Sequence, residues 1–394
     1  MEIAVSCLDD GLVLLDGDRV ERVDGLPTTG LAASSGRVGR ARFDPAETAT
    51  SGELLVYEPG GLERRLVVPG LADAHDIAWD GDILGAVSTL GNAVLWIDQE
   101  GQVVRRWQPP GSGDCRHLNG LVVQSGRALV TAFGRFTRHR EWAVRPREER
   151  GVLLDATTDR VVAAGFSSPH SPREVDGRLL LCDSGRSELV VLSWSGCIER
   201  RVPLTGWTRG IAVAGDHVYV GESARRGEGA FATVAVLTRD SLTLVHRVEL
   251  PVREVYNLLP LPRGVTRRLA TPSSRLPPMP ALPPSDLRAS IQLDAVPPLR
   301  RGELSTLECT VTNLGRRSLL TAQPHPVSIA SHWEPPTRCL WSPLPRAISP
   351  GETVRCSTRV LAPGRPGRHA LRLSLVQERV AWLTGHLVAE IEVV

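Results

Sequence analysis

The sequence predicts an all-β protein: a six-bladed β-propeller closed by its N-terminal strands, followed by a C-terminal immunoglobulin-like β-sandwich. Segments that begin a strand before a glycine turn recur at intervals of about 40 to 50 residues, which is the period of a four-stranded propeller blade. Apolar residues alternate with polar ones at a period of two, and no helical periodicity competes. The repeated segments are residues 29–33, 75–79, 119–123, 171–175, 209–213 and 256–260.

The fifth unit shows the four strands of a blade, and the last unit together with the N-terminal segments makes up the remaining blade. In the fifth unit we expect strands at residues 209–213, 217–221, 233–237 and 244–250. The sixth unit stops after 256–261, whereas residues 3–6, 11–15 and 19–23 form strands without partners nearby. Pairing these segments closes the ring and removes its exposed sheet edges.

The remainder of the chain divides into a linker and a second β domain. Residues 263–286 are rich in Pro and Arg, as expected of an extended linker. Short β segments separated by Pro and Gly turns follow in residues 287–394. We therefore expect the propeller in residues 1–262, the linker in 263–286 and the sandwich in 287–394.

Composition limits the partners and the compartment. The net charge is +2 and all 46 basic residues are Arg, which favours neither nucleic acid nor an acidic partner. The chain has no apolar run long enough for a membrane span and no signal-peptide pattern at its start. Seven cysteines without paired spacing fit a cytoplasmic protein, although one bridge among Cys309, Cys339 and Cys356 is left open.

Three histidines stand at the starts of first strands, at what we take to be equivalent points of the repeat: His75, His117 and His170. Arg209 starts the first strand of its own blade. Starts of first strands and ends of second strands share one face of a propeller, so Asp183 and Glu222 are expected there too. An open three-histidine site would bind a divalent metal, zinc first, with copper or manganese as alternatives. The alternative is that each histidine closes its own blade through local hydrogen bonds.

The other polar residues of this face have two interpretations each. We assign substrate binding to Arg209, Arg173, Asn119 and Asn257, and proton transfer to Glu222 or Asp183. The alternatives are an ion pair to Asp183 or Glu222 across the channel for Arg209 and Arg173, and turn formation for the two carboxylates. The long connection of residues 133–150, rich in Arg with Phe136 and Trp142, is either a lid, an anion-collecting rim or a solvated loop.

Several motifs in order carry a family resemblance: residues 75–79, 115–121, 168–173 and 183–185. Over residues 1–270 the chain resembles a bacterial family of six-bladed propellers of unknown function, and no established activity can be carried over from it. The C-terminal part is similar to sandwich domains appended to glycan-export and glycosyl-transfer proteins, through residues 311–313, 331–333 and 376–382. Peptide-amidating lyases resemble the proposed arrangement in architecture, because they hold zinc with one histidine from each of three blades.

The leading functional hypothesis is a metal-dependent lyase, hydrolase or isomerase that acts on a small anionic molecule or peptide at the channel mouth, in specialised biosynthesis. The alternative is a non-catalytic module that binds a glycan or a protein, with the sandwich taking part. Neither hypothesis involves nucleic acid or a membrane.

Overall fold

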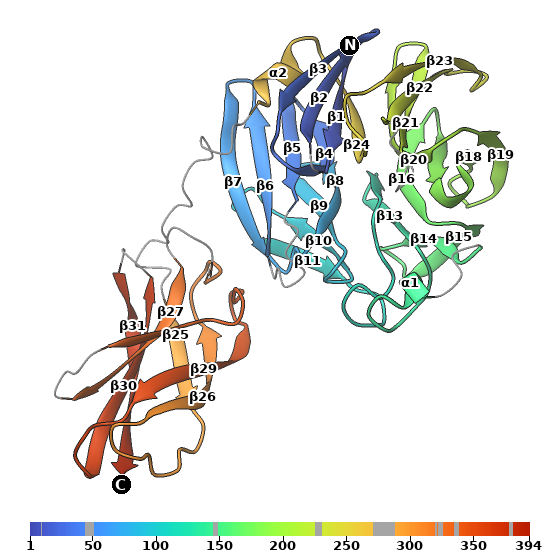
Figure 1. Cartoon of the computed structure of the whole chain (residues 1–394). Helices are drawn as coiled ribbons and strands as arrows, with labels where there is room; N and C mark the ends of the chain where they lie inside the picture. Colours follow the sequence, from blue (N-terminus) through green and yellow to red (C-terminus); the bar gives the residue numbers. More distant parts are fainter. Residues whose placement is uncertain are drawn as a thin grey trace. The chain divides into compact units, whose positions relative to one another are not determined.

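The computed structural model divides the chain into two compact units, Met1–Leu276 and Pro277–Val394, each of which is described here by itself (Figure 1). It describes residues 1–8, 10–43, 51–144, 149–224, 231–270, 288–319, 321, 326–334, 339–377 and 381–394. Most of the expected linker, residues 271–286, and Arg145 and Arg147 of the long connection lie outside the described residues.

Within the described residues, the first unit contains six four-stranded antiparallel sheets, which are the predicted blades. The first consists of β24 (Asn257–Leu261), β1 (Glu2–Cys7), β2 (Gly11–Asp16) and β3 (Arg19–Asp24); the second of β4 (Thr28–Ser34), β5 (Arg37–Arg42), β6 (Ser51–Glu58) and β7 (Gly61–Pro69); the third of β8 (Ala74–Asp80), β9 (Ile83–Ser88), β10 (Ala93–Ile97) and β11 (Val103–Trp107). The fourth consists of β12 (Leu121–Gln124), β13 (Arg127–Ala132), β14 (Gly151–Asp155) and β15 (Arg160–Phe166); the fifth of β16 (Pro169–Val175), β17 (Arg178–Asp183), β18 (Glu188–Leu192) and β19 (Ile198–Pro203); the sixth of β20 (Trp207–Ala214), β21 (His217–Ser223), β22 (Thr233–Thr238) and β23 (Leu244–Glu249).

The ring closes as the sequence predicts. Strand β24 pairs antiparallel with β1, with Leu258 opposite Val5, so one blade combines both ends of the unit. The innermost strands contact one another all the way round, in the order β4, β8, β12, β16, β20, β24 and back to β4. The all-β propeller fold is therefore confirmed.

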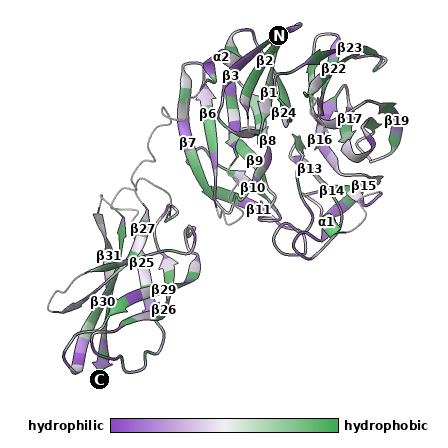
Figure 2. Cartoon of the chain, in the orientation of Figure 1, coloured by the Kyte–Doolittle hydropathy of each residue, from purple (hydrophilic) through white to green (hydrophobic). Residues whose placement is uncertain are grey.

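Apolar residues hold neighbouring blades together, because the buried core clusters of this unit combine residues of adjacent sheets. The strands of the propeller carry many hydrophobic residues (Figure 2). One core cluster joins Ile77 and Leu84 of the third blade to Leu54 of the second, and another joins Val94 to Val130 across the third and fourth blades. Burial of these side chains on both sheet faces supplies the main stabilisation of the ring.

A fully buried arginine fastens the closing blade to its neighbour. Arg40 on β5 forms an ion pair of 2.6 Å with Asp24 at the end of β3 and donates a hydrogen bond to the carbonyl of Leu269. Leu269 follows helix α2 (Val265–Arg268), whose Thr266 is buried against the propeller. The chain thus remains part of the first unit beyond residue 262, inside the segment expected to be linker.

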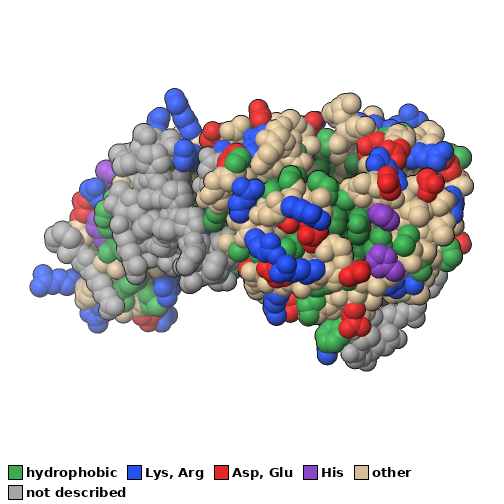
Figure 3. All heavy atoms as spheres, turned by 90° about the horizontal axis from the view of Figure 1, so that it is seen from above, with side chains coloured by type: hydrophobic (Ala, Val, Ile, Leu, Met, Phe, Trp, Pro, Cys, Tyr) green, Lys and Arg blue, Asp and Glu red, His purple; other side chains and the backbone are tan. Residues whose placement is uncertain are grey.

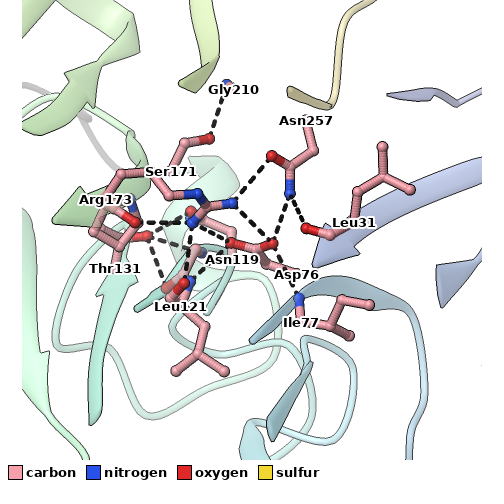
Figure 4. A network of polar contacts seen from close by, with 12 residues as sticks. Leu31, Asp76, Ile77, Asn119, Leu121, Thr131, Ser171, Arg173, Gly210 and Asn257 are labelled. Carbon is pink, nitrogen blue, oxygen red and sulfur yellow. Dashed lines mark hydrogen bonds and ion pairs between the residues drawn. The ribbon is translucent and has the colours of Figure 1, made fainter. Parts of the chain in front are cut away.

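A polar network ties all six innermost strands together at the centre of the ring (Figure 4). The carboxylate of Asp76 on β8 accepts hydrogen bonds from the backbone N–H of Leu121 (3.0 Å), the side-chain amide of Asn257 (2.8 Å) and the guanidinium of Arg173 (3.1 Å). The two remaining strands join through the carbonyl of Leu31 on β4, which accepts from Asn257, and through the N–H of Gly210 on β20, which donates to Ser171 on β16. We call this set the channel network.

The second unit is a β-sandwich. Its two sheets have the strand orders β25 (Ala289–Leu293), β26 (Leu304–Asn313), β29 (Thr353–Leu361) and β28 (Leu340–Pro343), β27 (Val327–Glu334), β30 (Gly367–Gln377), β31 (Ala381–Val393). A core cluster contains Val311 and Val354 of the first sheet and Ile329 and Leu375 of the second. All seven cysteines of the chain are free thiols, including Cys309 and Cys356, which lie opposite each other on β26 and β29.

Among the described residues, no helix is long and apolar enough to cross a membrane. On the face shown in Figure 3, basic and acidic side chains are interspersed over the first unit. Several surface arginines have carboxylate partners, such as Arg178 with Glu199 and Arg239 with Asp176.

Candidate functional site

Four residues expected at the channel mouth lie together: His75, His117, His170 and Arg209. The ring centroids of His75 and His117 are 5.1 Å apart. Phe133 bridges the other two, with its centroid 4.3 Å from that of His117 and 5.3 Å from that of His170. Tyr256 connects Arg209 to His75, because its ring lies under the guanidinium and its hydroxyl reaches the imidazole. We call the three histidines the histidine cluster.

Strand register shows that two of the histidines are equivalent and the third is not. Ala74 pairs with Ser88, the sixth residue of β9, so His75 stands opposite the fifth residue of that strand. His170 pairs with Cys182 and Arg209 with Gly221, and each partner is likewise the fifth residue of its strand. In the fourth blade the fifth residue of the second strand, β13, is Thr131. The residue opposite it is Asn119, whose backbone N–H donates to the Thr131 carbonyl. His117 therefore precedes the repeat position by two residues. It returns to the mouth because its backbone takes a left-handed conformation, with φ of 50°, held by Asn119, whose amide donates to the His117 carbonyl at 3.0 Å.

His75 has a partner on each ring nitrogen. Its Nδ1 lies 3.3 Å from the carbonyl oxygen of Asp73 and 3.2 Å from the carboxylate oxygen Oδ1 of the same residue. Its Nε2 lies 2.8 Å from the hydroxyl of Tyr256. Burial raises the pKa of Asp73, but the neighbouring side chains of His75, His117 and Arg209 outweigh burial and leave this pKa below its ordinary value.

His117 is oriented by a buried carboxylate and enclosed by aromatic rings. Both oxygens of Asp114 lie 3.1 Å from His117 Nδ1, so Nδ1 carries the hydrogen and Nε2 has the lone pair. Phe133 and Trp142 each place a ring centroid 4.3 Å from the imidazole. Burial lowers the pKa of His117, although Asp114 opposes this effect.

His170 is held in the same tautomer by neutral acceptors. Its Nδ1 lies 2.9 Å from the carbonyl of Ser168 and 2.8 Å from the hydroxyl of Ser184. That hydroxyl donates its own hydrogen to the carbonyl of Thr208, so it accepts from His170. Burial, followed by the charges of Arg209 and the other two histidines, lowers the pKa of His170 well below its ordinary value. His170 is therefore neutral at pH 7.

Arg209 is the cation beside the histidine cluster. Its Nη1 contacts a carboxylate oxygen of Glu254 at 3.0 Å, and its Cζ lies 3.4 Å from the ring centroid of Tyr256. A guanidinium has five N–H donors, so one contact with a carboxylate leaves capacity for a second anion. Arg209 thus pairs with Glu254 rather than with Asp183 or Glu222.

The structure does not bring Asp183 and Glu222 to the mouth. Asp183 accepts from the N–H of Ser167 and pairs with Arg201 on the outermost strand β19. Glu222 accepts from the N–H of Thr205 and pairs with Arg247 on β23. Burial raises the pKa of Glu222, but these partners leave it below its ordinary value. Both carboxylates fasten the outer strands of their blades, and this geometry does not support proton transfer at the mouth.

Arg173 and Asn257, assigned to substrate binding, belong instead to the channel network. The guanidinium of Arg173 contacts Asp76 and the side-chain oxygen of Asn257, at 3.1 and 3.0 Å. The contact with Asp76 is an ion pair across the channel. The alternative interpretation of Arg173 predicted such a pair, but with Asp183 or Glu222 as the partner. Asn119 orients His117 and Thr131 rather than facing a ligand.

The long connection covers His117. Helix α1 (Glu141–Val144) places Trp142 against the imidazole, and Trp142 Nε1 donates to the carbonyl of Asp114 at 3.0 Å. The same carbonyl accepts from the N–H of Arg140 at 2.8 Å. This part of the connection therefore packs against His117 and is not a solvated loop.

Sequence reasoning did not assign a role beside the histidines to the residues that contact and orient them: Asp73, Asp114, Phe133, Trp142 and Tyr256. A signal was present, since Asp73 and Asp114 precede His75 and His117 by two and three residues. In the parts of the chain that the structure describes, no three His, Cys, Asp or Glu side chains form a group that could hold a metal ion.

The fold and the site together define a six-bladed propeller with a histidine cluster at one mouth of its channel. The family described as Domain of unknown function (DUF4915) matches residues 46–266, and the chain belongs to this family. The expected membership of a propeller family of unknown function is confirmed to this extent. No curated protein matches the chain.

Solved structures with a similar fold are distant in sequence. A protein of unknown function from Bacteroides caccae is 12% identical, with a TM-score of 0.48, and the match covers 66% of this chain and 98% of that one. A calcium-binding protein, regucalcin, from Agrobacterium tumefaciens is 14% identical, with a TM-score of 0.43 and coverage of 59% and 78%. A chain of a nidogen/laminin complex is 11% identical, with a TM-score of 0.49 and coverage of 66% and 97%. No function is transferred from these similarities.

The buried imidazoles predict how stability depends on pH. The folded protein lowers the pKa of His117 and His170 below the unfolded value of about 6.5, so the unfolded chain binds more protons in this range. Their contribution is complete above pH 6.5 and is lost as the pH falls through the folded values. Urea unfolding at pH 7.5 and 5.5 should therefore show a smaller loss of stability for His170→Gln than for the wild type. Equal losses would contradict this assignment.

Proposed function

We propose that the protein is an enzyme that acts on a small anionic molecule at the channel mouth, with neutral imidazoles as its acid–base groups. One observation carries the proposal: His117 and His170 both have Nδ1 in a hydrogen bond to an acceptor, which leaves Nε2 as a lone-pair base. A general base must be neutral at the working pH and held in orientation. Burial supports the first condition and the Nδ1 partners support the second.

Arg209 supports the choice of an anionic substrate. It is a buried cation beside the histidine cluster, and its ion pair with Glu254 engages one N–H of the five, which leaves donors for a carboxylate or a phosphate. Trp142 and Phe133 pack their aromatic rings against His117 and against each other, which favours a small ligand that is removed from water. Proton transfer on such a molecule fits a lyase, a hydrolase or an isomerase.

Binding can be measured before the reaction is known. A panel of small carboxylates and phosphates should include ligands that bind the wild type in calorimetry and change the fluorescence of Trp142. Losing a hydrogen bond to a charged group costs about 1.5–3 kcal/mol, so Arg209→Met should weaken such a ligand by about 10- to 150-fold. Arg239→Met, which removes an exposed arginine paired with Asp176, is the control. If no anion binds, or if Arg209→Met binds equally well, the proposal fails and a non-catalytic binding module takes its place.

A bound divalent metal is the second candidate for the same site. The tautomers favour it, because metal-bound histidines usually donate their other ring N–H to a carboxylate or a carbonyl. Zinc is the first choice, and copper and manganese are alternatives. The hydroxyl of Tyr256 now occupies Nε2 of His75, so binding by all three histidines requires this hydroxyl to move. One zinc ion bound to chelator-free wild type and lost in His117→Ala would support this candidate, and absence of binding would remove it.

The proposal for the C-terminal unit is an immunoglobulin-like sandwich that contacts a glycan or a protein. The strand orders β25-β26-β29 and β28-β27-β30-β31 support the immunoglobulin-like topology. Exposed Trp341 and Trp382 on the second sheet support a contact surface. Glycan-array binding that is lost in Trp341→Ala with Trp382→Ala is the test.

A further inference from the structure

Tyr256 differs from an ordinary buried tyrosine because its hydroxyl is bonded to a histidine. The hydroxyl oxygen lies 2.8 Å from Nε2 of His75, and the two ring centroids are 5.4 Å apart. Tyr256 immediately precedes β24, whereas His75 lies on β8, so the contact joins two different blades at the mouth of the channel.

The contact at the other ring nitrogen of His75, Nδ1, determines which atom donates in the hydrogen bond between Tyr256 and Nε2. Nδ1 lies 3.3 Å from the carbonyl oxygen of Asp73, which can only accept a hydrogen bond. Nδ1 therefore carries the hydrogen in the neutral ring, and Nε2 has the lone pair. It follows that Tyr256 donates its O–H hydrogen to Nε2. The carboxylate oxygen Oδ1 of Asp73, at 3.2 Å from Nδ1, is placed to balance a positive charge on the ring.

Arg209 completes the surroundings of Tyr256. Its guanidinium carbon lies 3.4 Å from the centroid of the Tyr256 ring. A cation over an aromatic face stabilises electron density in that ring, and the stabilisation increases when the pair is removed from water. Both residues are buried. Burial raises the pKa of the Tyr256 phenol above its ordinary value, and the charge of Arg209 opposes this effect by favouring negative charge on the Tyr256 oxygen.

We propose that Asp73, His75 and Tyr256 form a proton relay in which Tyr256 is the catalytic residue for the proposed acid–base reaction. In the forward step the Tyr256 oxygen takes a proton from the substrate while its own hydrogen moves to His75 Nε2. His75 becomes an imidazolium that Asp73 stabilises, and the substrate retains the electron pair. Return of the two protons completes the cycle, and no oxidant or reductant is needed.

The position of Arg209 narrows the substrate class. Arg209, which binds the anionic group of the substrate, lies over the ring of Tyr256, which removes the proton. The proton that Tyr256 removes therefore belongs to an atom of the substrate near its anionic group. The substrate is therefore a small carboxylate or phosphate with a removable proton on an adjacent carbon or hydroxyl. This inference rests on the proposed function, and Asp73 and His75 act in it as positioning residues.

Chemical labelling of the full chain tests the relay without any substrate. An aryl sulfonyl fluoride reacts with an activated tyrosine: the new bond joins the phenol oxygen to sulfur, fluoride leaves, and the phenol proton passes to the base. Peptide mass spectrometry should find Tyr256 labelled faster than Tyr219. Tyr219 is an internal control because it is less buried and lies beside the ring of His217, with centroids 6.3 Å apart.

The matched variant is His75→Gln, which retains a hydrogen-bonding side chain without a base. Because a positioned base contributes large rate factors, labelling of Tyr256 should fall at least about tenfold while labelling of Tyr219 is unchanged. No labelling of Tyr256 in the wild type, or an equal rate in His75→Gln, would overturn the relay. Anion binding that persists in that case would leave the proposed function intact. Labelling as expected without any anion binding would retain the relay and reject the substrate class.

Discussion

Replacing Asp76 with alanine is expected to destabilise the propeller by about 3–5 kcal/mol, because it leaves the guanidinium of Arg173 in the channel without its carboxylate. The same change removes the acceptor for the N–H of Leu121 and for the side-chain amide of Asn257. These donors come from three other blades, so several innermost strands lose their connection at once. Urea unfolding followed by circular dichroism measures the effect.

The control for this variant is Asp176→Ala, which breaks an ion pair with Arg239 at the surface. Exposed pairs contribute little to stability because water screens both charges, so the unfolding midpoint should not change measurably. A loss of less than about 1 kcal/mol in Asp76→Ala, the range of an exposed pair, would mean that water replaces the carboxylate and that the channel network does not hold the ring.

Deleting residues 1–25 is expected to abolish soluble folding. The deletion removes β1, β2 and β3, exposes the edge of β24 that pairs with β1, and takes Val5, Val13 and Leu15 out of the core between the closing blade and β22. It also removes Asp24, which leaves Arg40 buried without its carboxylate. Exposed strand edges pair between molecules, so aggregation should follow. Expression followed by size-exclusion chromatography measures the outcome.

A chain ending at Leu276 provides the comparison, because it retains the complete ring and lacks only the second compact unit. We expect this chain to be soluble and to unfold cooperatively. Should the chain without residues 1–25 also be soluble and unfold cooperatively, closure by the N-terminal strands would not be needed for folding.

The propeller could be predicted from sequence because both of its determinants are local. The alternation of apolar and polar residues is visible within each strand, and the repeat period is visible when successive units are compared. The segments at 3–23, which have no partner nearby in the sequence, identify the closing blade. The four strands predicted for the fifth unit of the repeat, which begins at Arg209, correspond to β20 to β23 of the structure. Each predicted end differs from the observed one by at most two residues.

The site was predictable only in part, because side-chain direction depends on register. In β16 the pairing shifts between His170 and Arg173, which turns Arg173 from the mouth into the channel. At the ends of β17 and β21, Asp183 and Glu222 face the outer strands because arginines there provide their partners. The left-handed backbone of His117 and the contact of Trp142 depend on tertiary packing, which no periodic pattern encodes.

Nuclear magnetic resonance of the histidine side chains tests the central claim most directly, because it reports on each Nε2 while an anion from the panel is added. The account predicts that the signals of His75, His117 and His170 shift together with one affinity, and that His217 and His246 do not change. It also predicts lone pairs on Nε2 of His117 and His170 at pH 7 before any ligand is added. Protonated Nε2 atoms in the free protein, or an anion that shifts His217 and His246 while the histidine cluster is unaffected, would contradict it.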